Sequence, residues 1–339
     1  MRRETRRTLA QWTTFGLGGP AEQLSIAESD DDLVTLAREG APLLAGGSNV
    51  LIADEGLPQV ALVRTTGIAL DADGTRVTAA AGETWDTLVS FAVERGLSGI
   101  ECLSGIPGSV GATPVQNVGA YGQEIADTLT EVSAWDRVEG ARVTLRPEDL
   151  AFGYRDSALK SRFPGRYVVL SVTFALTRAA PVVPPYRELE AAVAALGAPP
   201  DVAALRATVI SLRKKKGMVL DPADPDTRSA GSFFTNPVLD AAAFEALLAK
   251  ADDAPGHASP DGKTKVPAAW LIERAGFKKG HARGGAAISS KHALALTNRA
   301  DATSADVFAL AREIRDGVAE RLSVVLEPEP VLLGFRERL

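Results

Sequence analysis

The sequence predicts an α+β protein, and three observations lead to this class. Segments with strand-like alternation are joined by short turns, and Asp73-Gly74 marks a tight hairpin turn between two of them. Short amphipathic helices are interspersed without the regular alternation of a parallel α/β sheet. The stretch SGIPGSVGATPVQNVGAYG, residues 104–122, holds five glycines and two prolines, so no regular helix or strand can contain it.

Residues 104–122, which we call the central loop, predict an anion-binding cradle. Glycine lets a bare backbone N–H approach a ligand closely, and successive N–H groups form a concave anion site. A solvated surface turn is the alternative for any glycine-rich run. The loop also carries Val110, Val115, Val118 and Tyr121, which a solvated linker does not need. We therefore expect it to be buried.

Composition restricts the class of partner. The 339 residues suffice for two or three domains, and 45% hydrophobic with 24% charged content is typical of globular proteins. With a net charge of −6, the chain lacks the excess positive charge that is typical of nucleic-acid-binding proteins. No apolar run is long enough to insert into a membrane. Cys102 is the only cysteine, and no signal peptide is recognisable, so we expect a cytoplasmic protein without disulfides.

The first third of the chain predicts turns, a helix and paired strands. Residues 13–24 contain a G-x-G-x-x-A pattern, but no apolar strand precedes it and Pro20 interrupts it, so we interpret it as a turn. Ser29 begins a helix that Gly40 ends. Residues 41–56 are predicted as strand, tight loop and strand. The loop itself is either a plain hairpin turn or a phosphate cradle, and both interpretations stay open.

The remaining elements follow from helical spacing and prolines. We expect a helix over 85–95, a strand over 167–176, and a domain boundary near the prolines of 181–185. A helix follows Tyr186, and the next one ends in the basic run 213–216. Such a run either complements the helix dipole or binds phosphate, and we weigh the two equally. Further helices are expected near 241–250, 267–275 and 304–321, before an extended segment.

Several chemistries are excluded. The three histidines lack metal-ligand spacing, so we predict no metal. Residues 256–264 mimic a P-loop, but they place five residues between the glycines and include Pro260. No G-x-S-x-G elbow appears.

Six motifs in order resemble one known family. These are GGSNVL, the central loop, FGYRDS, GSFFTNP, WLIERAG and LEPE. Together they resemble the UDP-N-acetylenolpyruvoylglucosamine reductases, the MurB-type flavoenzymes of bacterial peptidoglycan precursor synthesis, over nearly the whole chain. The resemblance implies a PCMH-type (vanillyl-alcohol-oxidase-like) FAD-binding fold plus a C-terminal α+β substrate-binding domain.

The resemblance also implies a division of the chain. FAD-binding lobe 1 would cover 1–75, with the strand region 324–339 packing back on it, and FAD-binding lobe 2 would cover 76–180. Linking helices would cover 181–225 and the substrate-binding domain 226–323. We expect a monomer.

The implied reaction is NADPH-dependent, FAD-mediated reduction of UDP-N-acetylglucosamine enolpyruvate to UDP-N-acetylmuramate. Hydride would pass from flavin N5 to C3 of the enolpyruvyl group, and Ser232 would give a proton to C2. No histidine precedes His257, so we expect non-covalent FAD, with NADPH as co-substrate.

Site residues are carried over from the matching motifs. Arg155 would neutralise the developing enolate, Ser232 would be the proton donor, and Glu329 would hold or polarise the substrate carboxylate. The residues implied to bind the substrate are Tyr121, Tyr186, Lys216, Asn236 and His292. Those implied to bind the cofactor are Ala45, Gly46, Gly47, Ser48, Asn49, Ser104, Gly105, Pro107, Gly108, Gly111, Ala112, Asn117 and Gly119.

Alternatives remain for each catalytic residue. Arg155 could simply pair with Asp156 or Glu329, Ser232 could cap a helix or form a turn, and Glu327 could replace Glu329. The chain departs from the family pattern in two places. Thr235 stands where a lysine often occurs, and Ala45 stands where the loop has a further glycine.

Two other functions compete with the reductase. One is an oxidase of the same fold, which returns electrons to oxygen. The other is a non-catalytic protein that binds flavin or a UDP-sugar. Ser232 and Glu329 in their motifs argue against the oxidase, and the presence of all three catalytic residues argues against the binding protein.

Overall fold

The structure is a computed structural model that describes residues 1–259, 262–299 and 301–339. The chain divides into two compact units, each built from segments distant in sequence. Unit 1 comprises Met1–Arg7, Ala21–Gly47 and Pro58–Val219, and unit 2 comprises Thr8–Pro20, Ser48–Leu57 and Leu220–Leu339. The finer division into lobes and linking helices stays a prediction. Among the described residues, no helix combines the length and apolar character needed to cross a bilayer.

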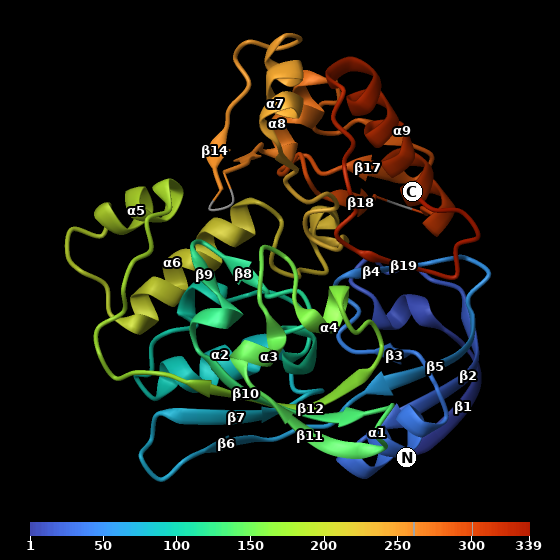
Figure 1. Ribbon diagram of the computed structural model, residues 1–339, viewed down its shortest axis with the longest axis vertical. Coiled ribbons are helices and arrows are strands. Elements are labelled where there is room, and N and C mark those ends of the chain that lie inside the picture. The colour runs from blue at the N-terminus through green and yellow to red at the C-terminus, as the bar shows by residue number, and fades with distance from the viewer. Residues whose placement is uncertain (260–261, 300) are drawn as a thin grey trace. The chain divides into compact units, whose positions relative to one another are not determined.

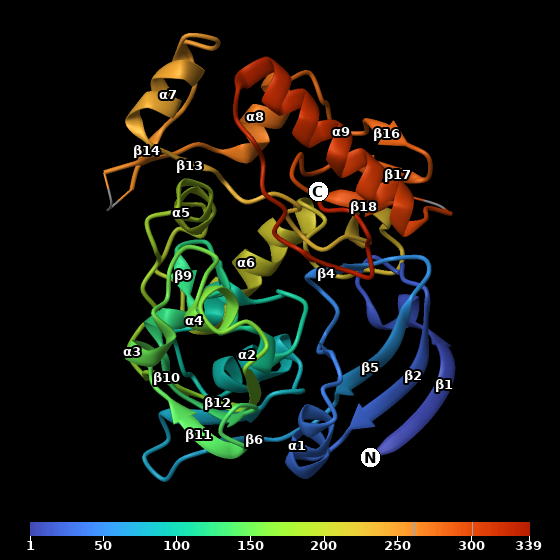
Figure 2. The ribbon, with the colours of Figure 1, turned by 45° about the vertical axis from the view of Figure 1, so that its right-hand side comes forward.

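The first sheet of unit 1 has four strands in the order β1-β2-β5-β3 (Figure 2). These are β1 (Arg2–Thr8), β2 (Pro20–Ala27), β5 (Leu57–Val63) and β3 (Leu43–Leu44). Helix α1 (Asp30–Arg38) begins where the Ser29 hydroxyl accepts the Asp32 N–H at 3.2 Å. Its apolar face packs Leu33 and Leu36 into one cluster with Val63. The predicted helix after Ser29 is confirmed.

The second sheet of unit 1 has five antiparallel strands in the order β11-β10-β12-β7-β6 (Figure 1). They are β11 (Ala141–Leu145), β10 (Leu129–Asp136), β12 (Tyr167–Ala175), β7 (Arg76–Ala80) and β6 (Ile68–Leu70). Pairing of Leu70 with Val77 places the predicted hairpin turn at Asp73-Gly74. Trp85, the first residue of α2 (Trp85–Glu94), meets Phe174 of β12 edge-on, with ring centroids 5.7 Å apart.

The rest of unit 1 consists of helices, two-residue strands and single 3₁₀ turns. The helices are α3 (Pro147–Leu150), α4 (Ala158–Ser161), α5 (Arg187–Ala194) and α6 (Val202–Lys215), and the strands are β8 (Gly119–Ala120) and β9 (Gln123–Glu124). Single 3₁₀ turns cover Glu101–Leu103, Val110–Ala112 and Ile125–Asp127. Helices α5 and α6 share an apolar cluster with Cys102 and Tyr121. The predicted helix that ends in the basic run is confirmed as α6.

Within the residues that the structure describes, the strands of unit 2 form three small sheets. β4 (Val50–Ile52) pairs in parallel with β19 (Val331–Leu333). β16 (Ala282–Arg283), β17 (Ala286–Ile288) and β18 (Leu296–Asn298) form one antiparallel sheet, and β13 (Val238–Leu239), β15 (Thr264–Lys265) and β14 (His257–Ala258) form another. Because β3 pairs with β5 and β4 with β19, the plain hairpin interpretation of the 46–49 loop is wrong.

Two motif exclusions are confirmed. A dinucleotide fingerprint needs a helix after its glycines, but β2 begins at Pro20. A P-loop needs a strand followed by a helix, whereas β14 and β15 pair antiparallel. Pro260 and Asp261, which fall within that stretch, lie outside the described residues.

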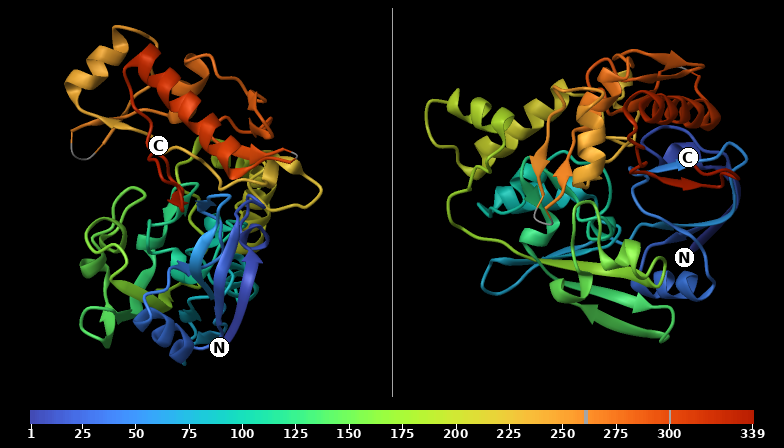
Figure 3. Two further views of the ribbon diagram at one scale, coloured as in Figure 1. Left: turned by 90° about the vertical axis from the view of Figure 1, so that its right-hand side faces the viewer. Right: turned by 45° about the horizontal axis from the view of Figure 1, so that its top comes forward.

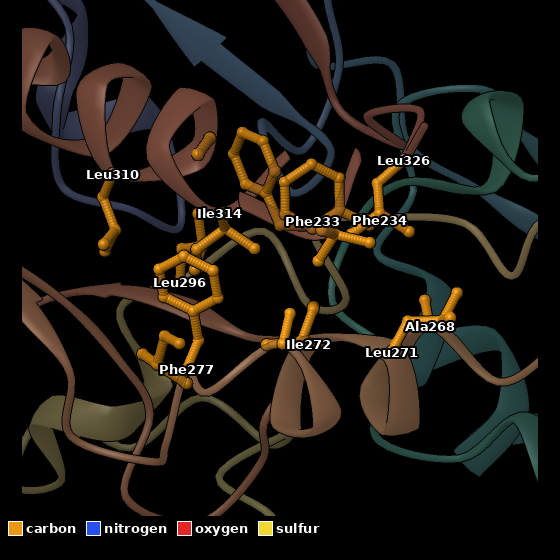
Figure 4. Packing of buried hydrophobic residues seen from close by; sticks show 14 of the residues in the cluster. Phe233, Phe234, Ala268, Leu271, Ile272, Phe277, Leu296, Leu310, Ile314 and Leu326 are labelled. Atoms are coloured by element: carbon orange, nitrogen blue, oxygen red, sulfur yellow. The ribbon is translucent and has the colours of Figure 1, made fainter. Parts of the chain in front are cut away.

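The core of unit 2 lies between its helices and the GSFFTNP segment. The helices are α7 (Ala241–Leu248), α8 (Ala268–Arg274) and α9 (Ser304–Leu322), and α9 lies along β16, β17 and β18 (Figure 3). Phe233 and Phe234 are fully buried and pack with Ile272 of α8 and Ile314 of α9 (Figure 4). These contacts fix the residues on either side of the two phenylalanines.

One buried carboxylate organises the end of an inner strand of the five-stranded sheet. Asp136, at the end of β10, is 2% exposed and accepts hydrogen bonds from Arg166 Nε at 3.0 Å and Nη2 at 2.7 Å. The Val138 N–H donates to it at 2.8 Å. The Arg166 hydrogen bonds hold the pKa of Asp136 below its ordinary 3.8, although burial opposes them.

We predict that Asp136→Asn lowers the Tm at neutral pH by a few degrees because it removes this charge-assisted contact. Since the folded-state pKa is depressed, the carboxylate stabilises the fold above about pH 4 and ceases to do so as pH falls through the lowered pKa. Thermal unfolding of both proteins between pH 3 and 7 checks this. A Tm difference that stays constant over that range would contradict it.

Candidate active site

The central loop is buried and irregular, as predicted. It contains a 3₁₀ turn at Val110–Ala112 and the two-residue strand β8, with winding backbone between them. Ser104 and Val110 are fully buried, and Asn117 is 1% exposed. The surface-turn interpretation is therefore wrong.

The first turn of α2 holds the start of the loop. The Trp85 indole N–H donates to the Leu103 carbonyl at 2.9 Å, and the Trp85 backbone N–H donates to the Gly108 carbonyl at 3.0 Å. The Asp86 carboxylate accepts the Gly105 N–H at 2.6 Å. Asp86 also forms a bidentate ion pair with Arg206 of α6, whose Nη1 and Nη2 donate to Oδ1 at 2.7 Å and to Oδ2 at 2.8 Å. No sequence signal distinguished Asp86 from other acidic residues near a helix start.

Two glycine loops of unit 1 meet backbone to backbone. A Cβ on Gly46 would lie 2.5 Å from Gly108 Cα and 3.0 Å from the Ser109 nitrogen. Within the described part of the chain, the amides of Gly46, Gly108 and Ser109 donate no hydrogen bond. Buried or half-buried amides need acceptors, and an anionic ligand supplies them. These residues therefore fit the predicted phosphate cradle.

Other residues predicted to bind the cofactor shape this cradle. A Cβ on Gly111 would lie 2.5 Å from the Ala81 Cβ, so only glycine allows that approach. The Ala45 carbonyl accepts Arg64 Nη1 at 2.8 Å, and Ala45 avoids the left-handed region, so its departure from the family glycine carries no strain. Pro107 and Ala112 lie in the same loop, and Ala112 closes its 3₁₀ turn onto Ser109.

Backbone strain gathers at the predicted site of unit 1. Asn117, Tyr121 and Arg155 have φ of 46°, 49° and 53°, a region that non-glycine residues rarely adopt. The Asn117 side chain supports its own position, because its amide donates to Glu124 at 2.8 Å and to the Gly153 carbonyl at 3.1 Å. Such strained residues often cluster where function needs a fixed geometry.

Arg155 lies against the end of the central loop. Its Nη2 donates to the Gly119 carbonyl at 2.6 Å, and a Cβ on Gly119 would lie 3.0 Å from Nη1. The Ser157 hydroxyl donates to the Val115 carbonyl at 2.7 Å and ties FGYRDS to the loop. The loop backbone therefore orients the guanidinium directly.

Tyr121, Tyr186 and Lys216 come together in unit 1. The two tyrosine rings meet edge-on at 5.1 Å, and Lys216 Nζ lies 5.5 Å from the Tyr121 ring centroid. Burial raises the pKa of Tyr121 to about 12, so its hydroxyl stays protonated. Lys216 also forms an ion pair with Glu188, which the sequence did not reveal.

In unit 2, the GSFFTNP segment is held on both sides. Ser232 forms an isolated bridge with Ala295, and the Phe233 N–H donates to the Leu294 carbonyl at 2.7 Å. On the other side, the Glu329 N–H donates to the Phe233 carbonyl at 2.9 Å. Ser232 therefore lies in an extended segment and caps no helix, so that alternative is wrong.

The carboxylates of LEPE differ in exposure. Glu327 is exposed and Glu329 is half-buried, which favours Glu329 as the site residue. The Asn49 amide donates to the Glu329 carbonyl at 3.3 Å, and the Val331 N–H donates to the Asn49 carbonyl at 3.0 Å. Asn49, predicted as a cofactor residue beside Ser48, thus also fixes the backbone of Glu329.

The two remaining predicted residues of unit 2 flank this segment. The Asn236 side-chain oxygen accepts the Ala268 N–H at 2.8 Å at the start of α8. His292 lies in the turn before Ala295, where its N–H donates to the Ser289 hydroxyl at 3.2 Å. Both are half-buried. Ser232 and Glu329 therefore lie on directly bonded segments, and the segment that bonds Ser232 at Ala295 also carries His292, whereas Asn236 contacts the start of α8.

Comparison with known proteins decides the family. Residues 221–333 match the family model "UDP-N-acetylenolpyruvoylglucosamine reductase, C-terminal domain", and residues 27–146 match "FAD binding domain". The UDP-N-acetylenolpyruvoylglucosamine reductase of Streptomyces avermitilis is 51% identical over 344 residues, which cover 96% of this chain and 93% of that protein. The chain belongs to the UDP-N-acetylenolpyruvoylglucosamine reductase family.

Further members of this family agree in length and fold. The Mycolicibacterium gilvum reductase is 48% identical, with 96% of this chain and 95% of that protein covered. The crystal structure of the Thermus caldophilus reductase matches with a TM-score of 0.68 at 31% identity, over 98% of this chain and 99% of that one. The predicted α+β class, with an FAD-binding domain followed by the family's C-terminal domain, is confirmed, and the chain is an oxidoreductase of this family.

We predict that Gly46→Ala weakens FAD binding by roughly ten- to a hundredfold. The added Cβ forces the two glycine loops apart, and overpacking of this kind costs about 1–3 kcal/mol. Flavin fluorescence after dialysis measures the retained cofactor. Gly153→Ala is the matched control, because its Cβ would meet only Asp156 Cβ at 3.9 Å. Equal flavin retention in both variants would show that the loop contact is not needed.

Proposed function

We propose that this chain catalyses the NADPH-dependent reduction of UDP-N-acetylglucosamine enolpyruvate to UDP-N-acetylmuramate, a step of peptidoglycan precursor synthesis, with non-covalent FAD. One observation carries the proposal beyond family membership. The Glu329 N–H donates to the Phe233 carbonyl, so the carboxylate-bearing and serine-bearing motifs run side by side within unit 2. This pairing of the two segments supports the proposal that Ser232 and Glu329 would act on the same substrate.

The cofactor would be held mainly through backbone groups. The amides of Gly46, Gly108 and Ser109 would donate to its phosphates, and the small residues of the central loop leave the backbone accessible. Bound FAD would supply hydride from N5 to C3 of the enolpyruvyl group.

Arg155 would stabilise the negative charge that develops on the substrate carboxylate and C2. A planar guanidinium suits this task because it offers a fixed fork of donors and stays charged. The Gly119 carbonyl already orients it through Nη2. Little reorganisation would therefore be needed when the substrate binds.

Ser232 would deliver the proton to C2. Glu329 would hold or polarise the substrate carboxylate from the neighbouring segment. Asn236 and His292 would bind the sugar side, while Tyr121, Tyr186 and Lys216 would bind the nucleotide diphosphate.

The decisive experiment follows the flavin spectrum in two anaerobic steps. NADPH should bleach the yellow protein, and UDP-N-acetylglucosamine enolpyruvate should then restore the oxidised spectrum. Recovery with oxygen but not with the enolpyruvyl substrate would favour the oxidase. Absence of bleaching would favour the non-catalytic binding protein.

We predict that denaturation releases all the flavin into the supernatant. No histidine precedes His257, and Cys102 is fully buried. Burial, together with the adjacent Glu101, raises the pKa of the Cys102 thiol to about 12, so no thiolate forms near neutral pH. Absorbance of the supernatant and the pellet measures this. Flavin retained in the pellet would overturn the prediction, and Cys102→Ser would then locate the attachment.

We predict that Lys216→Ala raises KM for the enolpyruvyl substrate by roughly ten- to a hundredfold, because a charge-assisted contact contributes about 1.5–3 kcal/mol. Flavin reduction by NADPH should barely change. Lys214→Ala is the control, since Lys214 belongs to the same basic run and is exposed. Equal KM values in the two variants would assign the run to the helix end alone.

We predict that Ser232→Ala leaves flavin reduction by NADPH intact but slows reoxidation by substrate at least about 100-fold. Positioned general acids contribute roughly 10²–10⁴-fold in rate. Ser232→Cys keeps a transferable proton and should recover part of the loss. Stopped-flow measurement of each half-reaction checks both variants. Near-normal reoxidation in the alanine variant would move the proton donor elsewhere, and Glu329 would be tested next.

A further inference from the structure

Lys216 is already neutralised by an anion of the chain itself. Its ammonium forms an ion pair with the Glu188 carboxylate, and the two side chains are 30% and 39% exposed. The same ammonium lies over the Tyr121 ring. The residue proposed to bind the substrate diphosphate is therefore paired with a carboxylate of the chain itself.

One short segment delivers this carboxylate. Tyr186 directly precedes α5, and its ring contacts Tyr121, while Glu188 lies in the first turn of the same helix. Leu189 is fully buried in the cluster with Leu205 and anchors α5 against α6. The start of α5 thus places both an aromatic ring and a carboxylate on residues proposed to bind the nucleotide.

If the Glu188 carboxylate and a diphosphate bound Lys216 at the same time, they would repel each other electrostatically. The lysine supplies a single positive charge, whereas a diphosphate brings at least two negative ones beside Glu188. Like charges at a half-buried site repel each other, so binding of a diphosphate favours release of the carboxylate. A singly charged anion gains less from Lys216 and displaces Glu188 less readily.

We propose that Glu188 is an internal competitor of the substrate diphosphate, which lowers substrate affinity and selects multiply charged phosphate groups over single anions. The proposal rests on the diphosphate contact of Lys216 in the proposed function. If Glu188 competes in this way, neutralising its carboxylate should raise the affinity for a diphosphate. A substitution that merely damaged the fold would lower that affinity.

Calorimetric titration of the flavin-loaded protein with UDP tests this, because UDP carries the diphosphate without the enolpyruvyl group. Glu188→Gln should bind UDP about two- to fivefold more tightly, the range that corresponds to loss of a half-exposed ion pair. The gain should shrink at high salt. Glu190→Gln is the matched control, because it removes the same charge from an exposed position on α5. Its UDP affinity should change less than that of Glu188→Gln.

Measurements on Lys216→Met, alone and combined with Glu188→Gln, distinguish failure of the competitor role from failure of the diphosphate contact. In Lys216→Met, UDP affinity should fall, and the added Glu188→Gln should give a smaller gain than it gives with Lys216 present, because only direct repulsion between the carboxylate and the diphosphate remains. Unchanged or weaker UDP binding by Glu188→Gln, while Lys216→Met loses affinity, would overturn the competitor role alone. Unchanged UDP binding by Lys216→Met would overturn the diphosphate contact itself, and the competitor role with it.

Discussion

The candidate site depends first on the hydrogen bonds that hold the central loop. A glycine-rich segment has little conformational preference of its own, so its shape must be imposed by its surroundings. The first turn of α2 does this through Trp85 and Asp86, and the buried amide of Asn117 does it further along. Asp86 satisfies the Gly105 amide, and the Trp85 backbone N–H satisfies the Gly108 carbonyl, so the loop amides that these contacts leave unused have a defined place.

Asp86 also connects two functions within unit 1. Its carboxylate holds the Gly105 amide and the Arg206 guanidinium at once, and Arg206 belongs to the helix that ends beside Lys216. Burial alone raises the pKa of Asp86, but the hydrogen bonds from Arg206 and Gly105 outweigh it and keep the pKa below 3.8. The loop proposed for the flavin and the helix proposed for the substrate thus share one ionised carboxylate.

Local signals predicted the longer helices and the 73–74 hairpin, but not the four-residue helices α3 and α4. Caps, glycine stops and apolar spacing act within a few residues, which is why they could be recognised. Local signals gave no partner for β3 or β4. Only the family resemblance, which implied that residues 324–339 pack back on residues 1–75, pointed to the region of β19, whose residues come some 280 positions after those of β4. No element was predicted for β10 and β11 either. At the site, motifs named Arg155, Ser232 and Lys216, but not Glu188 or Asp86. A single carboxylate on an amphipathic helix looks like any solvated charge until tertiary contacts give it a partner.

Unit 2 combines two early segments of the chain with its last third, so the ribosome synthesises its parts at different times. All segments of unit 1 precede residue 220, so that unit can collapse while the ribosome is still translating. Segments 8–20 and 48–57 must instead wait for β19, because only residues 331–333 complete the pairing of β4. Until then Asn49 has no Glu329 carbonyl to bind, and an apolar strand stays exposed on the nascent chain. Slow or interrupted translation of the last third would therefore favour capture by chaperones or aggregation.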